Sequence, residues 1–64
     1  MNEIEMMENI RNDLISKLSW LNKELSTYYY PNQIIYIEDT MEKYREQLRK
    51  TNLEITILEI IEMK

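Results

Sequence analysis

A single proline, Pro31, divides a chain of 64 residues that contains no glycine. On both sides of it, large apolar residues recur in alternating steps of three and four, the spacing of one helix face. Each position on the first side adds to 62 with a position on the second. The pairs are Tyr28 with Ile34, Leu25 with Ile37, Leu21 with Met41, Leu18 with Tyr44, Leu14 with Leu48, Met7 with Ile55 and Ile4 with Leu58. This mirror predicts two helices folded back on each other, with these residues forming a seam between them.

The seam predicts an all-α fold, an antiparallel and coiled-coil-like two-helix hairpin that forms one domain over residues 1–64. We expect a first helix over about residues 3–29 with Asn2 as its N-cap, because Glu5 follows three residues later. A turn at 30–32 should follow, since proline cannot continue a helix, and Asn32 should cap a second helix over about 33–62.

The second helix has an alternative. Residues 33–37 and 53–57 are rich in β-forming side chains, so an α+β fold stays open. The residues from Thr51 to Glu54 also have the form of a capping box, which leaves a break near Thr51 possible. The uninterrupted seam register favours one continuous helix.

One further pair, Arg11 with Thr51, also adds to 62 and is the only polar layer of the seam. A buried charge is costly unless it is paired. We expect Glu8 or Glu54 to pair with Arg11, and the layer to fix the alignment of the helices rather than to add stability.

Apolar residues outside the seam point to an interaction surface. Hydrophobic residues make up 44% of the chain, and the seam accounts for about half of them. Leu53, Ile57 and Ile60 have helical spacing and form a second stripe that a hairpin cannot bury by itself. The predicted partner-binding residues are Met6, Ile10, Trp20, Tyr29, Tyr30, Leu53, Ile57, Ile60 and Ile61. We expect either a second copy there, giving a dimer built as a four-helix bundle, or a different protein.

Charge restricts the kind of partner. The chain has 12 acidic and 8 basic residues, and residues 1–8 and 53–64 together carry six acids and one lysine. Glutamates around an apolar patch favour a basic protein and disfavour membranes and nucleic acid. A cluster of basic residues in the second helix nevertheless keeps an RNA-binding regulator as an alternative: Lys43, Arg45, Arg49 and Lys50.

The composition also bears on catalysis and location. The chain has no histidine, cysteine or glycine, and so lacks the commonest general base, the strongest nucleophile and a phosphate-binding loop. We therefore expect no enzyme activity, no metal and no cofactor. No apolar run approaches the ~20 residues of a membrane span and no signal sequence begins the chain, so a cytoplasmic location is expected.

In length and layout the chain resembles the plasmid RNA-binding repressor-of-primer hairpin and the small co-chaperones of type III secretion needles. The run Asn22-Lys23-Glu24-Leu25-Ser26 is similar in part to the Ser-Gln-Glu-Leu-Asp run of sporulation phosphorelay phosphatases, although it lies in the other helix. These resemblances imply an RNA-binding hairpin, or a small phosphatase or inhibitor of a signalling protein, as alternatives. From the residues themselves we expect a regulator, adaptor or small chaperone that binds another protein.

Overall fold

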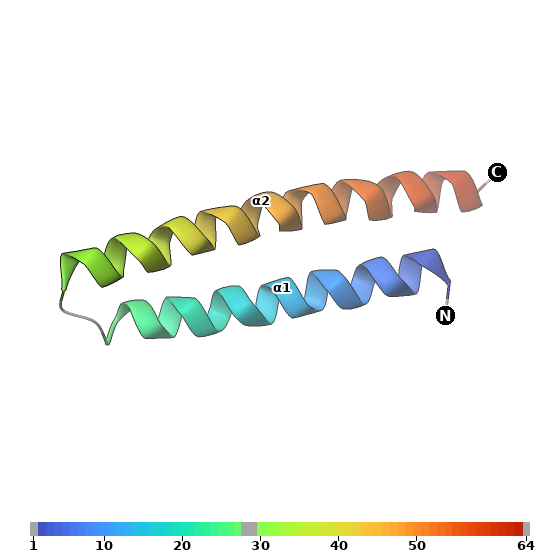
Figure 1. Ribbon diagram of the computed structural model, residues 1–64. Coiled ribbons are helices and arrows are strands. Elements are labelled where there is room, and N and C mark those ends of the chain that lie inside the picture. The colour runs from blue at the N-terminus through green and yellow to red at the C-terminus, as the bar shows by residue number, and fades with distance from the viewer. Residues whose placement is uncertain (1, 28–29, 64) are drawn as a thin grey trace.

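The structure is a computed structural model that describes residues 2–27 and 30–63, and within them it consists of two helices (Figure 1). Helix α1 spans Glu3–Leu25 and helix α2 spans Pro31–Glu62. The helices lie side by side and antiparallel, with the two ends of the chain at one end of the hairpin and the turn at the other. The predicted all-α hairpin is confirmed. The α+β alternative is wrong, because residues 33–37 and 53–57 are helical throughout.

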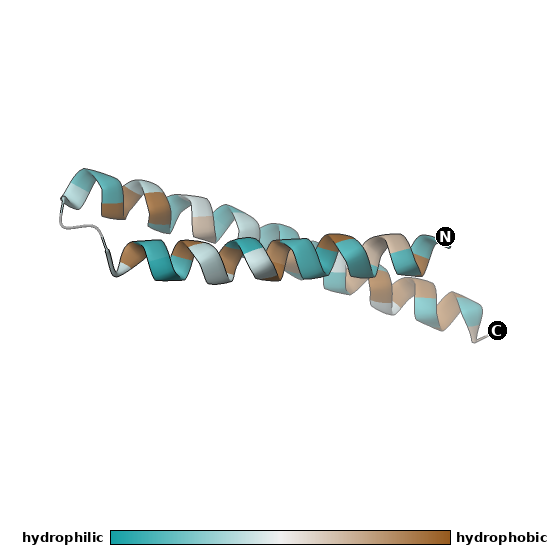
Figure 2. Ribbon diagram, turned by 90° about the horizontal axis from the view of Figure 1, so that it is seen from below, coloured by the Kyte–Doolittle hydropathy of each residue, from teal (hydrophilic) through white to brown (hydrophobic). Residues whose placement is uncertain are grey.

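The hairpin is long and thin. It measures 52 × 17 × 12 Å, and its radius of gyration is 15.0 Å, against about 11 Å for a compact domain of this length. Viewed from below, the two helices cross at a point along their length (Figure 2). A pair of this shape has a single interface along which side chains can be buried, so most of the surface of each helix faces outward.

The seam forms that interface. The buried residues are Leu14, Leu21, Ile37, Met41, Thr51 and Ile55, and the remaining described seam positions are all half-buried. Outside the seam, the half-buried residues in the described part of the chain are Glu8, Glu24 and Thr40. The mirror pattern therefore identified the packed face residue by residue in the described part of the chain.

A core this thin should be sensitive to the loss of one side chain. Leu14 is 4% exposed, so Leu14→Ala removes packed atoms and leaves a cavity, which costs about 2–4 kcal/mol. Leu53, at 58% exposed, provides the matched control, and Leu53→Ala should change stability by less than about 0.5 kcal/mol. Thermal unfolding followed by circular dichroism measures both. Equal losses for the two variants would mean that the seam is not the core.

The start of α1 follows the prediction. Asn2 has an extended backbone and its side-chain Oδ1 accepts a hydrogen bond from the Glu5 backbone N–H at 2.8 Å. This bond satisfies one of the N–H groups that have no partner within the helix. Glu3 and Glu5 add negative charge in the first turn, where the helix dipole favours it.

Removal of this cap should destabilise the hairpin. Asn2→Ala loses the acceptor for the Glu5 N–H, and we expect a cost of about 1 kcal/mol in the free energy of unfolding. Asn12→Ala is the control because Asn12 is exposed inside the same helix, where alanine is the better helix former. Denaturant unfolding should show a loss for the first variant and none for the second. A loss of the same size in both would contradict the capping role.

Helix α1 ends at Leu25, earlier than the predicted residue 29. The side-chain hydroxyl of Ser26 donates to the Lys23 carbonyl at 2.7 Å, and that of Thr27 donates to the Glu24 carbonyl at 2.8 Å. The same two carbonyls also accept the backbone N–H groups of Ser26 and Thr27, at 3.2 and 3.0 Å. Backbone and side-chain donors together therefore satisfy the helix end, which terminates without a glycine. The seam position Tyr28 and the predicted site residue Tyr29 lie outside the described residues.

The turn prediction is also corrected at the start of α2. Pro31 is the first residue of the helix rather than part of the turn, and Tyr30 is the N-cap, with no side-chain cap bond. Proline is well suited to this position, because its missing N–H would have no partner there. Asn32 lies inside the helix, so its predicted role as the cap is wrong.

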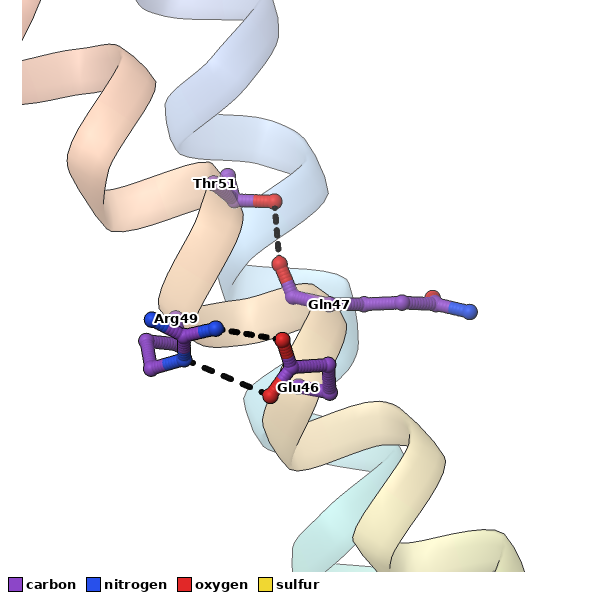
Figure 3. Close-up of polar contacts among 4 residues, drawn as sticks. All are labelled: Glu46, Gln47, Arg49 and Thr51. Atoms are coloured by element: carbon purple, nitrogen blue, oxygen red, sulfur yellow. Dashed lines mark hydrogen bonds and ion pairs between the residues drawn. The ribbon is translucent and has the colours of Figure 1, made fainter.

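Helix α2 continues without interruption past Thr51. The Thr51 hydroxyl donates to the Gln47 carbonyl one turn earlier, at 2.8 Å (Figure 3). Thr56 bonds the Asn52 carbonyl in the same way at 3.0 Å. The Thr51 hydroxyl, which makes a capping box plausible in the sequence, is thus used within the helix, and the predicted continuity of α2 is confirmed.

Candidate interaction surface

Many large apolar side chains outside the seam are exposed, most of them toward the two ends of the hairpin. In the described part of the chain they are Met6, Ile10, Ile15, Trp20, Tyr30, Ile35, Tyr36, Leu53, Ile57, Ile60, Ile61 and Met63. This set includes every predicted partner-binding residue that the structure describes; Tyr29 is the exception because it lies outside those residues. Exposed apolar area in such quantity marks interaction surfaces in proteins.

A groove between the helices lies near the two ends of the chain. This open-end groove has a volume of about 430 Å³ and is lined by Glu3, Met6, Met7, Glu54, Ile57 and Leu58. The half-buried seam residues Met7 and Leu58 are its deeper members, and Met6 and Ile57 are exposed beside them. Two glutamates border this apolar groove, so it presents an acidic edge to any occupant.

A second groove lies near the turn. This turn-end groove has a volume of about 310 Å³ and is lined by Trp20, Leu21, Glu24, Asn32, Gln33, Tyr36 and Ile37. Trp20 is 60% exposed and Tyr36 is 72% exposed. Two aromatic side chains thus border one apolar groove. Tryptophan and tyrosine are among the residues that contribute most to the binding energy of protein interfaces.

Tyr36 was not among the predicted partner-binding residues, although the sequence contains a signal for it. Tyr36 stands one position before the seam residue Ile37, just as Trp20 stands one position before Leu21. Met6 and Ile57 have the same relation to Met7 and Leu58. Residues with the same offset from the seam lie on the same side of an antiparallel pair.

Both grooves therefore lie on one side of the hairpin. Except for Asn32, the exposed residues that line the two grooves stand one position before a seam residue. On each helix such positions recur in steps of three and four, so they form one stripe. We call this side the grooved face; it comprises Glu3, Met6, Ile10, Asp13, Lys17, Trp20 and Glu24 of α1 and Gln33, Tyr36, Thr40, Lys43, Gln47, Lys50, Glu54, Ile57 and Ile61 of α2. Its two ends are apolar and its middle is polar.

The polar middle is held by contacts within the hairpin. Lys17 Nζ lies 2.9 Å from Asp13 Oδ2 and 5.6 Å from the centre of the Tyr44 ring on α2. The hydrogen bond and the charge of Asp13 raise the pKa of Lys17. Lys43 pairs with Asp39 at 3.2 Å. Exposed pairs of this kind add little stability, but they neutralise part of the basic charge at the centre of the grooved face.

The opposite side of the hairpin is more polar. A third groove there has a volume of about 710 Å³ and is lined by Asn22, Leu25, Ile35, Glu38, Asp39, Met41, Glu42 and Arg45. Ile15 and Ile35 are exposed on this side among charged and amide side chains. Polar groups lose hydration on binding, so this side is less suited to a dry interface.

The Arg11–Thr51 layer differs from the prediction. Arg11 is half-buried, but none of the ion pairs in the described part of the chain involves it, so the expected pairing with Glu8 or Glu54 is wrong. Glu54 instead lines the open-end groove. Thr51 is 8% exposed and its hydroxyl is satisfied by its own helix. The layer therefore combines an unpaired guanidinium with a satisfied hydroxyl.

Replacement of Arg11 by leucine should stabilise the hairpin, because no ion pair is lost and an apolar side chain joins the seam. For Arg11→Leu we expect a gain of about 1 kcal/mol, which raises the melting temperature by roughly 4–8 °C. The control is Arg45→Leu, at an exposed position. Differential scanning calorimetry measures both variants. A lower melting temperature for Arg11→Leu would show that Arg11 stabilises the fold.

A second ion pair on α2 is local. Arg49 forms two hydrogen bonds with Glu46, one turn earlier on the same helix (Figure 3). The hydrogen bond from Arg49 lowers the pKa of the Glu46 carboxyl, and the same bond raises the pKa of Arg49. Arg49 is therefore already engaged with an acid on its own helix.

The described residues contain no cluster of three or more potential metal ligands. Neither helix, over the residues described, is long and apolar enough to cross a lipid bilayer.

Comparison with known proteins supplies no relative: no family model, no curated protein and no solved structure matches the chain.

Proposed function

We propose that this protein is a non-enzymatic interaction module that pairs with a second copy as a four-helix bundle and binds another protein as a regulator, adaptor or small chaperone. The observation that supports it best is the apolar surface left exposed outside the seam. Ile57, Ile60 and Ile61 are 47%, 53% and 60% exposed. A stripe of this kind on a helix is normally covered by another element.

Self-association and partner binding can use different parts of that surface. Met6 and Ile57 belong to the grooved face, where they line the open-end groove between the helices. Leu53 and Ile60 are two turns apart on the same side of α2 and point away from the seam. A second copy on the grooved face would leave Leu53 and Ile60 free for another protein, and the neighbouring Glu54, Glu59 and Glu62 favour a basic one.

RNA binding is supported less well. Of the basic residues predicted for it, Lys43 is paired with Asp39 and Arg49 with Glu46. Lys43 also lies on the grooved face whereas Arg45 lines the groove on the opposite side. Cations spread around a helix in this way do not form the continuous basic patch that backbone recognition uses.

The phosphatase alternative meets a similar difficulty. Asn22 and Glu24 are the residues that would face a partner's active site, yet Asn22 lines the groove on the polar side and Glu24 lines the turn-end groove. The two side chains are therefore presented on different sides of the hairpin. No observation favours this activity over binding.

The proposal is tested by the mass in solution of the native chain and of two matched variants. Ile57 and Ile15 are 47% and 48% exposed but lie on opposite sides of the hairpin. The native chain should be a dimer, and Ile57→Glu should raise its dissociation constant at least about tenfold, because a carboxylate would be buried in the interface. Ile15→Glu should leave the dimer intact. A monomeric native chain at high concentration would refute self-association.

A further inference from the structure

Two apolar grooves on one face, at opposite ends, are the arrangement that a two-fold symmetric pair needs. If a second copy is turned end for end, the turn-end groove of each copy meets the open-end groove of the other, and both contacts form at once. We propose that a second copy of this chain packs on the grooved face in this antiparallel sense, with Trp20 and Tyr36 of each copy covering Met6 and Ile57 of the other. This inference rests on the proposed self-association and specifies its geometry.

The positions of the four residues agree with one symmetry axis. The midpoint between Met6 and Trp20 along α1 is residue 13, and the midpoint between Tyr36 and Ile57 along α2 lies between residues 46 and 47. Leu14 and Leu48 share one layer of the seam. Both midpoints fall within one helical turn of that layer, so a single axis near it serves both helices.

The exposed area fits a second copy. The accessible surface is 5273 Å², whereas a compact protein of 7.9 kDa exposes about 4,400 Å². The excess is about 900 Å², close to the roughly 800 Å² that each partner buries in a standard interface. Pairing on one long face would therefore reduce the accessible surface area of each copy to about that of a compact protein of the same mass.

Charge favours the antiparallel sense over the parallel one. A parallel pair would place two open ends together, each with six acids and one lysine in residues 1–8 and 53–64. Residues 17–45, around the turn, contain four bases and four acids and are neutral. An end-for-end pair places each acidic end beside a neutral one, which removes that repulsion.

The only tryptophan of the chain, together with the absence of cysteine, allows a direct test. A nitroxide quencher is attached to Glu54→Cys or to Lys43→Cys, each in a copy that also carries Trp20→Phe, and the labelled copy is mixed in excess with the native chain. In the antiparallel pair the residue 54 label lies level with Trp20 of the native copy, on the neighbouring helix, and the residue 43 label lies about 16 Å away along the axis. In a parallel pair the residue 43 label is the near one.

We expect loss of most Trp20 emission with the residue 54 label and little loss with the residue 43 label. If the residue 54 label disrupts pairing, Lys50→Cys in the polar middle replaces it, and its label should still quench more than the residue 43 label. Stronger quenching from residue 43, or quenching from no position in a confirmed dimer, overturns the antiparallel geometry but not self-association. A native chain that stays monomeric overturns both.

Discussion

Burial of a single apolar stripe between two helices is the interaction on which the rest of this structure depends. Most of the stability of a helix in a protein comes from packing one apolar face rather than from helix propensity. Here each helix packs only against the other, along Leu14, Leu21, Ile37, Met41 and Ile55. Everything else, the caps and the surface ion pairs included, adjusts a fold whose existence rests on that stripe.

The sequence predicted this stripe well because it has a strict period and because no glycine or second proline interrupts it. Tertiary packing then overrode local preference: the β-forming residues at 33–37 and 53–57 are helical because their seam members are needed at the interface. The ends were predicted less well. Helix α1 ends early at Leu25, where Ser26 and Thr27 bond the Lys23 and Glu24 carbonyls through both backbone N–H and hydroxyl groups. Such local geometry is not specified by composition.

The candidate surface was predicted in part. Trp20 and the residues of the open end are predicted from the sequence because they are apolar and lie outside the seam. Tyr36 is not predicted, because packing across the nearby turn would also account for a tyrosine at this position. To predict which exposed residues lie on the same side of the hairpin, the offset of each residue from the seam must be compared between the two helices. The ion pair expected for Arg11 is absent from the described residues. An arginine that could reach two acids in the sequence pattern need not adopt a side-chain conformation that brings it to either of them.

The start of α1 and the end of α2 lie at the same end of the hairpin (Figure 1), and the residues that line the open-end groove belong to that end. Any segment joined to either end, such as an affinity tag or a fused domain, is thereby held near that groove at a high effective concentration. A basic or apolar tag would compete with a binding partner, or mimic one, without any change in the hairpin itself. The turn lies at the far end of a molecule 52 Å long, so a label placed there would leave the open-end groove undisturbed.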